Sequence, residues 1–202
     1  MTMSASAVAA VSWFTVAGLC VAAGLAWAAE PAPPADNPVA VIETSLGNIT
    51  VELFRDRAPK SVENFLAYAE AGFYEGTVFH RVIRGFMIQG GGHKADLSRK
   101  PTRAAIQNEA TNGLKNTRGT LAMARTGEVN SATSQFFINT ADNRALDHKG
   151  QTTEGFGYAV FGKVIDGMDV VDKIEGAKTT RKDSYSDVPA EPIVIKSVKV
   201  KN

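Results

Sequence analysis

The stretch that decides the fold of this chain is Phe79-His80-Arg81-Val82-Ile83-Arg84-Gly85-Phe86-Met87-Ile88-Gln89-Gly90-Gly91. It mixes basic side chains with an unusual density of apolar ones, and a second mixed run follows at Ser131-Ala132-Thr133-Ser134-Gln135-Phe136-Phe137-Ile138-Asn139. Side chains alternate between the two faces of a strand, so Met87 and Gln89 should share one face, opposite Phe86 and Ile88. Arg81 could lie over the face of Met87 from a neighbouring strand. Apolar runs mostly build cores, so a buried core with Arg81 at its rim and a functional face both remain open here.

Patterns on either side of this stretch predict short strands and two helices. Residues 39–43 and 49–53 are rich in β-forming residues and enclose Gly47-Asn48, which predicts a hairpin. A helix is predicted to open over residues 56–59 and to end at Gly72. Its apolar positions follow the i, i+3, i+4, i+7 spacing of a helix packed on a core, at Val62, Phe65, Leu66 and Ala69.

The rest of the domain is predicted to contain more strands than helices. A second short helix is expected over 168–174. Further strands are expected over 77–82, 86–89, 120–124, 135–139, 159–164 and 192–200, and long loops over 90–118 and 142–157. Many strands with only two helices predict a mainly β fold, an antiparallel β-barrel capped by two α-helices.

The N-terminal segment has a composition of its own. Residues 1–29 contain no charged side chain, and an apolar stretch ends in Ala26-Trp27-Ala28. This small-x-small sequence predicts that residues 1–28 are a secretory signal peptide. The segment also lacks Lys and Arg and is long enough to span a bilayer, so an uncleaved anchor is the alternative. Residues 29–38 hold four prolines and predict an extended linker, with the folded domain over 39–202.

Composition and missing motifs exclude several classes of protein. The 202 residues carry 22 Lys and Arg against 21 Asp and Glu, which argues against a nucleic-acid binder or an acidic disordered chain. Cys20 is the single cysteine, so an internal disulfide framework and a thiolate zinc site are excluded. The three histidines lack metal-ligand spacing, and neither a G-x-S-x-G nor a G-x-x-x-x-G-K-S/T motif occurs. No hydrolase, kinase or dehydrogenase is indicated, and no metal or cofactor is expected.

The two mixed runs resemble the cyclophilin family of peptidyl-prolyl cis–trans isomerases. The pattern F-H-R-V-I-x-G-F-M-I-Q-G-G is long and ordered, and S-Q-F-F-I follows it at a matching distance. The resemblance continues through Leu146-Asp147 and Phe161-Gly162-Lys163-Val164, and it covers residues 39–200. The signal peptide, the 90–118 loop and the segment 158–162 look like exported bacterial members. The resemblance implies an eight-stranded antiparallel β-barrel closed by two α-helices.

The reaction of that family requires no nucleophile, metal or acid–base pair. An X–Pro bond rotates over a barrier of about 18–20 kcal/mol because the nitrogen lone pair is delocalised into the carbonyl. A quarter turn localises that lone pair, so a donor aimed at the prolyl nitrogen binds the twisted state in preference to the planar one. Arginine offers several donors in a fixed fork. Removing about 7 kcal/mol from the barrier corresponds to about five decades of rate.

Carried over to this sequence, the resemblance implies a catalytic pair and a proline pocket. Arg81 is implied as the principal catalytic residue, and Gln89 as the residue that hydrogen-bonds the substrate backbone and helps to hold the arginine. The apolar proline pocket is implied at Phe86, Met87, Phe137 and Leu146. Ordinary core packing is the alternative for these four side chains, and a plain rim salt bridge is the alternative for Arg81.

Four further residues are expected in or beside the site, and two of them differ from the common family pattern. Arg125 stands near the position where the family presents an asparagine whose backbone pairs with the peptide. Tyr158 aligns with a common pocket histidine, and Gln135 is expected among the substrate-binding residues. His80 is expected to be structural, because turnover needs no proton transfer.

The expected partners are proline-containing unfolded or partly folded polypeptides. The resemblance implies a monomeric periplasmic isomerase that assists folding of exported proteins, with no nucleic acid and, after signal cleavage, no membrane. A proline-recognising holdase or adaptor is the alternative, although binding a proline ring alone would not need Arg81. Cyclophilins that bind cyclosporin tightly carry a tryptophan before the Leu-Asp pair, where this chain has Ala145. Only weak binding of such a macrocycle is therefore expected.

Overall fold

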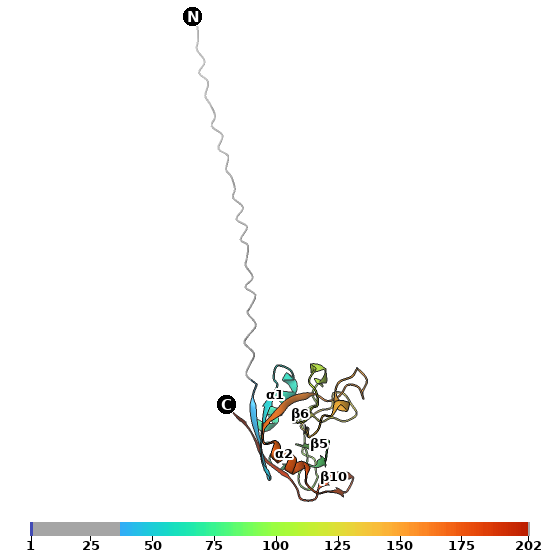
Figure 1. Ribbon diagram of the computed structural model, residues 1–202. Coiled ribbons are helices and arrows are strands. Elements are labelled where there is room, and N and C mark those ends of the chain that lie inside the picture. Colours follow the sequence, from blue (N-terminus) through green and yellow to red (C-terminus); the bar gives the residue numbers. More distant parts are fainter. Residues whose placement is uncertain (2–36, 202) are drawn as a thin grey trace. The chain divides into compact units, whose positions relative to one another are not determined.

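The computed structural model describes residue 1 and residues 37–201, and Figure 1 shows their fold. The predicted signal peptide and most of the predicted linker, up to residue 36, lie outside the described residues. The first strand, β1, begins at Val39. Within the described part of the chain, no helix combines the length and apolar character that crossing a membrane requires.

Nine strands form one curled antiparallel sheet in the order β3-β11-β1-β2-β8-β6-β7-β5-β4. A separate two-stranded ribbon pairs β9 with β10. The strands are β1 (Val39–Thr44), β2 (Gly47–Leu53), β3 (Thr77–Val78), β4 (Arg81–Ile83), β5 (Met87–Gly90), β6 (Thr120–Met123), β7 (Phe136–Asn139), β8 (Val160–Asp166), β9 (Thr179–Lys182), β10 (Tyr185–Pro189) and β11 (Val194–Lys201).

The mainly β, antiparallel class with two α-helices is confirmed, but the sheet is a half-barrel and has nine strands where eight were expected. The ninth strand arises because the single strand predicted over 77–82 is divided into β3 and β4, which lie at the two edges of the sheet. These two edge strands follow one another end to end and pair with opposite neighbours, β11 and β5. Between them, the Phe79 N–H donates to the Ile193 carbonyl at 3.0 Å and the His80 N–H to the Gln89 carbonyl at 3.0 Å. The edges are thus joined along one chain segment rather than by a side-by-side ladder.

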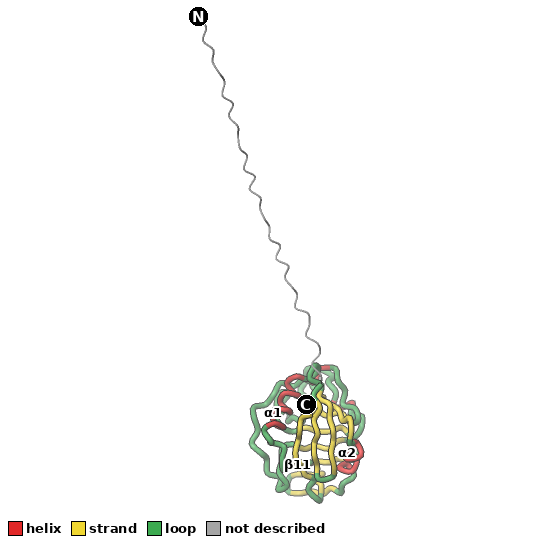
Figure 2. Tube along the Cα trace, turned by 90° about the vertical axis from the view of Figure 1, so that its left-hand side faces the viewer, coloured by secondary structure: helices red, strands yellow, loops and turns green. Residues whose placement is uncertain are grey.

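Two α-helices, α1 (Pro59–Glu70) and α2 (Met168–Glu175), complete the core. Figure 2 shows them on opposite sides of the strands. The predicted apolar stripe of α1 is buried, and Pro59 stands in its first turn, where a missing N–H costs nothing. Val170, Val171 and Ile174 of α2 are buried in the same core, together with the inner face of the sheet.

A second, smaller apolar cluster covers the other face of the sheet. Its buried members are Met87, Ala122, Phe137 and Val160. Each is the chain neighbour of a core residue, and these core residues are Ile88, Leu121, Ile138 and Phe161. Because successive side chains of a strand point to opposite faces, one member of each pair lies in the core and its neighbour lies in the outer cluster.

The β9–β10 ribbon and two short 3-10 helices have no counterpart in the sequence-based prediction. All four residues of β9, Thr-Thr-Arg-Lys, are exposed, so the ribbon lacks the alternation that marks a half-buried strand. The 3-10 helices η1 (Ala110–Asn112) and η2 (Arg144–Leu146) lie inside the two predicted long loops. Figure 1 shows the ribbon at the lower right of the domain, where β10 is labelled.

Candidate active site

The candidate site is built on one lateral row of the sheet. Arg81 of β4 lies opposite Gln89 of β5, Gln89 lies opposite Phe137 of β7, and Phe137 lies opposite Ala122 of β6. Directly opposed residues point to the same face, with Cβ atoms about 4.5–5.5 Å apart. The fold thus brings a cation, an amide and an aromatic ring into line on the face that carries the outer cluster.

A pocket of about 90 Å³ opens on this row. Phe86, Met87, Phe137 and Leu146 supply its apolar wall. Every site residue expected from the sequence lines it except Gln135; the lining is Arg81, Phe86, Met87, Gln89, Ala124, Arg125, Phe137, Leu146 and Tyr158. Gln135 lies beside the pocket, where its Oε1 accepts a hydrogen bond from Gln89 Nε2 at 2.9 Å.

Phe86 reaches the pocket against the alternation expected for a continuous strand. It precedes β5 and follows Gly85, which adopts φ +69° in the turn between β4 and β5. The Gly85 N–H donates to a Glu175 carboxylate oxygen at 2.7 Å, so α2 holds this turn. Because Phe86 belongs to the turn, its side chain joins Met87 on the pocket side.

The Arg81 side chain is exposed and ready to donate. None of the salt bridges in the described part of the chain includes Arg81. Its guanidinium also makes no hydrogen bond within residues 37–201. A ligand in the pocket would therefore meet donors that no protein group occupies.

Comparison with known proteins identifies the family. Residues 39–200 match the family described as cyclophilin type peptidyl-prolyl cis-trans isomerase/CLD. The chain belongs to this cyclophilin family. It is 56% identical over 157 residues to peptidyl-prolyl cis-trans isomerase B of Escherichia coli, covering 78% of this chain and 96% of that protein. Peptidyl-prolyl cis-trans isomerase A of Dickeya dadantii is also 56% identical, over 160 residues, covering 79% and 83%.

Solved structures agree with this assignment. A crystal structure of a Cryptosporidium parvum cyclophilin type isomerase in the presence of the dipeptide Ala-Pro is similar, with a TM-score of 0.67 at 30% identity. The match covers 81% of this chain and 99% of that one. This cyclophilin is therefore a peptidyl-prolyl cis–trans isomerase.

In this cyclophilin the Arg125 side chain has a task that the sequence did not indicate. Its Nε donates to the Gly157 carbonyl at 3.0 Å and its Nη2 to the Thr153 carbonyl at 2.7 Å. Its guanidinium carbon also lies 4.9 Å from the centre of the Tyr158 ring. Arg125 thus fixes the loop before β8 and holds Tyr158 edge-on against Phe137, with ring centres 5.7 Å apart.

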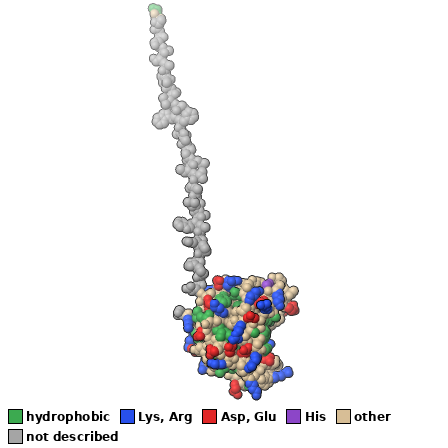
Figure 3. Space-filling model, viewed as in Figure 1, with side chains coloured by type: hydrophobic (Ala, Val, Ile, Leu, Met, Phe, Trp, Pro, Cys, Tyr) green, Lys and Arg blue, Asp and Glu red, His purple; other side chains and the backbone are tan. Residues whose placement is uncertain are grey.

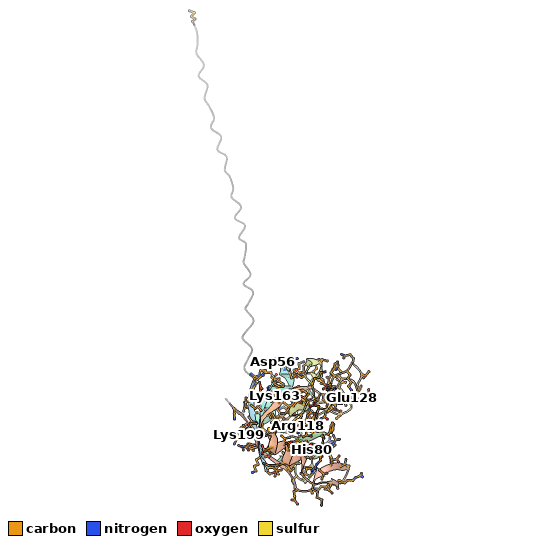
Figure 4. The ribbon with its side chains drawn as sticks, viewed as in Figure 1. Asp56, His80, Arg118, Glu128, Lys163 and Lys199 are labelled. Atoms are coloured by element: carbon orange, nitrogen blue, oxygen red, sulfur yellow. The ribbon has the colours of Figure 1, made fainter. Side chains whose placement is uncertain are left out.

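His80, the chain neighbour of Arg81, is buried next to a second histidine. Its ring centre is 4.0 Å from that of His93, whose Nε2 lies 3.2 Å from the Tyr185 hydroxyl. Burial, with a smaller contribution from His93, lowers the pKa of His80 to about 3. His80 is therefore uncharged near neutral pH. Figure 4 labels it in the lower part of the domain, near β10 of Figure 1.

A buried polar network behind the pocket was missed by the sequence analysis. Asn143 Nδ2 donates to the Phe86 carbonyl and to Asn139 Oδ1, each at 2.7 Å. The Asn116 N–H donates to Asp147 Oδ1 at 2.8 Å. The network fixes the segments that present Phe86 and Leu146. Asn139, Asn143 and Asp147 recur every four residues, but they lie outside any α-helix, so this spacing does not predict that they share a face. The one local signal is Asn139, a polar residue that ends an apolar run.

Proposed function

We propose that this cyclophilin catalyses X–Pro rotation by aiming the Arg81 guanidinium at the nitrogen of the twisted amide, and that it does so during folding of exported proteins in the periplasm. The observation that carries the mechanism is that Arg81 is exposed, has no ion-pair partner within residues 37–201, and lies in the same row as an apolar pocket. The export part rests on the signal sequence of residues 1–28.

The apolar wall supports the proline ring as the group that is held. Phe86, Met87, Phe137 and Leu146 offer no hydrogen-bonding side-chain group, so a ring without polar atoms is the part of the substrate that they suit. With the ring held, the residue before proline is the part that rotates. Holding the proline side of the X–Pro bond places its nitrogen in a fixed orientation relative to Arg81.

The charge of Arg81 distinguishes the two states of the amide. In the planar state the nitrogen lone pair is delocalised and offers no acceptor, whereas the twisted state presents an acceptor to the guanidinium. No partner among residues 37–201 has to be released when Arg81 turns to the substrate. Gln89, directly opposite in the row and tethered to Gln135, supplies the adjacent polar contact.

The Arg125 backbone supports docking of the peptide beside the proline. Within residues 37–201, neither its N–H nor its carbonyl makes a backbone hydrogen bond. A substrate strand could pair with both, and this pairing does not depend on the side chain. The family pattern has an asparagine near here, and arginine is compatible with the same backbone contact.

Replacing Arg81 by Ala tests the mechanism. In a protease-coupled assay on an X–Pro tetrapeptide, kcat/KM should fall by about 10²–10³-fold, as for loss of one transition-state donor. Affinity for a proline peptide, measured by calorimetry, should fall far less, because the pocket wall is unchanged. Arg55→Ala removes an exposed arginine outside the pocket and should leave both quantities unchanged.

Wild-type kcat/KM in Arg81→Ala would contradict the mechanism. If Arg81→Ala lost turnover but assisted a proline-containing client as well as the wild type, the binding-module alternative would replace it. Cell fractionation and N-terminal sequencing test the export part, for which a periplasmic chain starting at Ala29 is expected. A full-length chain in the cytoplasm would contradict export, and a full-length chain in the membrane would favour the uncleaved anchor over cleavage.

A further inference from the structure

A larger groove adjoins the proline pocket. It has a volume of about 580 Å³ and shares four lining residues with the pocket, namely Arg81, Gln89, Ala124 and Arg125. The β9–β10 ribbon forms part of its wall through residues 184–186. A peptide whose proline occupies the pocket therefore has neighbouring residues within reach of this groove.

The charges that line the groove are all of one sign. Arg81, Arg99 and Arg125 line it, and every other lining residue is Ala, Ser, Thr, Gln, Tyr or His. None of its lining residues is acidic. The two histidines add no charge near neutral pH, because burial lowers the pKa of both His80 and His93.

The three arginines differ in whether their guanidinium groups already have a partner. Arg125 is held by loop carbonyls, and Arg81 faces the reacting amide in the proposed function. The Arg99 side chain is exposed and takes part in none of the hydrogen bonds or ion pairs of residues 37–201. It is the cation of the groove that remains available for a substrate side chain.

Five cations elsewhere in the described part of the domain form ion pairs with acids. Arg118 contacts Asp172 at 2.7 Å and Lys163 contacts Glu52 at 3.1 Å. Figure 3 shows both signs of charge interspersed over one face of the domain. With a net charge of only +1, a groove lined by three arginines and no acid departs from the rest of the surface.

The acidic residues flanking the groove do not line it. Glu128 lies in the neighbouring loop, at the right of Figure 4, and Asp183 and Asp187 lie beside the lining residues of the ribbon. Asp96 is already engaged, because its Oδ1 accepts hydrogen bonds from the Ser98 N–H and hydroxyl. The interior of the groove thus keeps its positive charge for a ligand.

We propose that this groove selects X–Pro substrates that carry an acidic side chain close to the proline, and that Arg99 is the residue that determines this specificity. The inference rests on the proposed function, because it needs the proline ring in the pocket. A strand advances about 3.3 Å per residue, so the groove is reached within about three residues of the proline. Carboxylates are the peptide groups that pair with an unoccupied guanidinium.

Paired peptides test the proposal on the full protein. Each pair carries Glu or Gln at one position within three residues of the X–Pro bond, on either side, and is otherwise identical. At low salt, kcat/KM for Glu should exceed that for Gln by about three- to tenfold at one position or more, as expected for an exposed ion pair in a groove. The ratio should approach one at about 1 M salt, where the screening length is about 3 Å.

Two Arg99 variants and one control test whether Arg99 causes the preference for Glu over Gln peptides. Arg99→Gln should bring the Glu/Gln ratio close to one without changing turnover of the Gln peptides, and Arg99→Glu should favour Lys over Gln at the same position. Arg55→Gln removes the same charge from an exposed position outside the groove and should keep the wild-type ratio. Equal rates at every position in the wild type, or a ratio retained by Arg99→Gln, would overturn the proposal. The Gln peptides report the proposed function by themselves, because their turnover does not involve the charge of Arg99.

Discussion

Ala145 occupies the middle of η2, between Arg144 and the pocket residue Leu146, and its side chain is exposed. Its methyl group offers neither a hydrogen-bond donor nor a broad apolar wall. A tryptophan at this position would supply both at the rim of the pocket. The small side chain at the rim leaves the apolar pocket itself intact, so it should affect the binding of large ligands rather than turnover.

We predict that the wild type is an active isomerase with weak cyclosporin sensitivity, and that Ala145→Trp is inhibited about tenfold or more tightly. A recovered hydrogen bond contributes about 0.5–1.5 kcal/mol, and apolar contact adds about 25 cal/mol per Å² buried. Titrating the drug against activity measures both constants. Ala104→Trp, at an exposed position outside the pocket, is the control. Nanomolar inhibition of the unmodified protein would show that the rim argument is wrong.

At the scale of elements, strands supply the row of Arg81, Gln89 and Phe137 together with Met87, and the segments between strands supply the rest of the pocket wall. Phe86 stands in the β4–β5 turn, Leu146 in η2 and Tyr158 just before β8. Asn143 connects the first two of these segments, since its side chain donates to the Phe86 carbonyl while its own carbonyl accepts the Leu146 N–H at 2.9 Å. The positions of Phe86 and Leu146 in the pocket wall therefore depend on the hydrogen bonds of Asn143.

Asn143→Ala should loosen the wall without touching Arg81. The buried Asn139 Oδ1 loses its donor, and the Phe86 carbonyl keeps only the Thr140 N–H, so the free energy of unfolding should fall by about 1–3 kcal/mol. We expect kcat/KM to fall severalfold at a temperature where the variant is still folded. Denaturant unfolding and the coupled assay give the two quantities. Asn48→Ala, an exposed asparagine in the first hairpin, should change stability by less than about 0.5 kcal/mol. An Asn143→Ala protein as stable as this control would refute the network's role.

For the whole molecule, the buried histidines link stability to pH. The pKa of His80 is lowered to about 3 by burial, and that of His93 is lowered by burial and Arg99. The unfolded chain takes up these protons near pH 6.5, before the folded chain does. The free energy of unfolding must therefore decrease as the pH falls below about 6.5.

We expect the protein to be about 2 kcal/mol less stable at pH 5 than at pH 7.5 from His80 alone. Urea unfolding between pH 5 and 7.5 measures this, because the lowered pKa values of Glu43 and Glu52 affect stability only at lower pH. His80→Gln should flatten the slope, whatever its effect on stability at pH 7.5. A slope unchanged in this variant would show that His80 does not carry the effect.

The sequence alone determined the features that depend on neighbours along the chain. The first hairpin, the apolar stripe of α1 and the shared face of Met87 and Gln89 all follow from local periodicity, and the structure contains each of them. The family, and with it the isomerase activity, followed from ordered motifs. The same motifs named the expected site residues, and the fold brings these residues to one pocket with Gln135 beside it, while their roles stay a prediction.

Only the tertiary structure decided what depends on distant segments. The edge strand β3 pairs with β11, more than a hundred residues away, and local patterns carry no information about that pairing. Phe86 enters the pocket because a turn held by Glu175 of α2 frees it from strand alternation. The asparagine network and the arginine-lined groove are assembled from several loops and the β9–β10 ribbon. Periodicity records which side of an element faces inward, whereas burial and hydrogen bonding across the whole chain decide which elements meet.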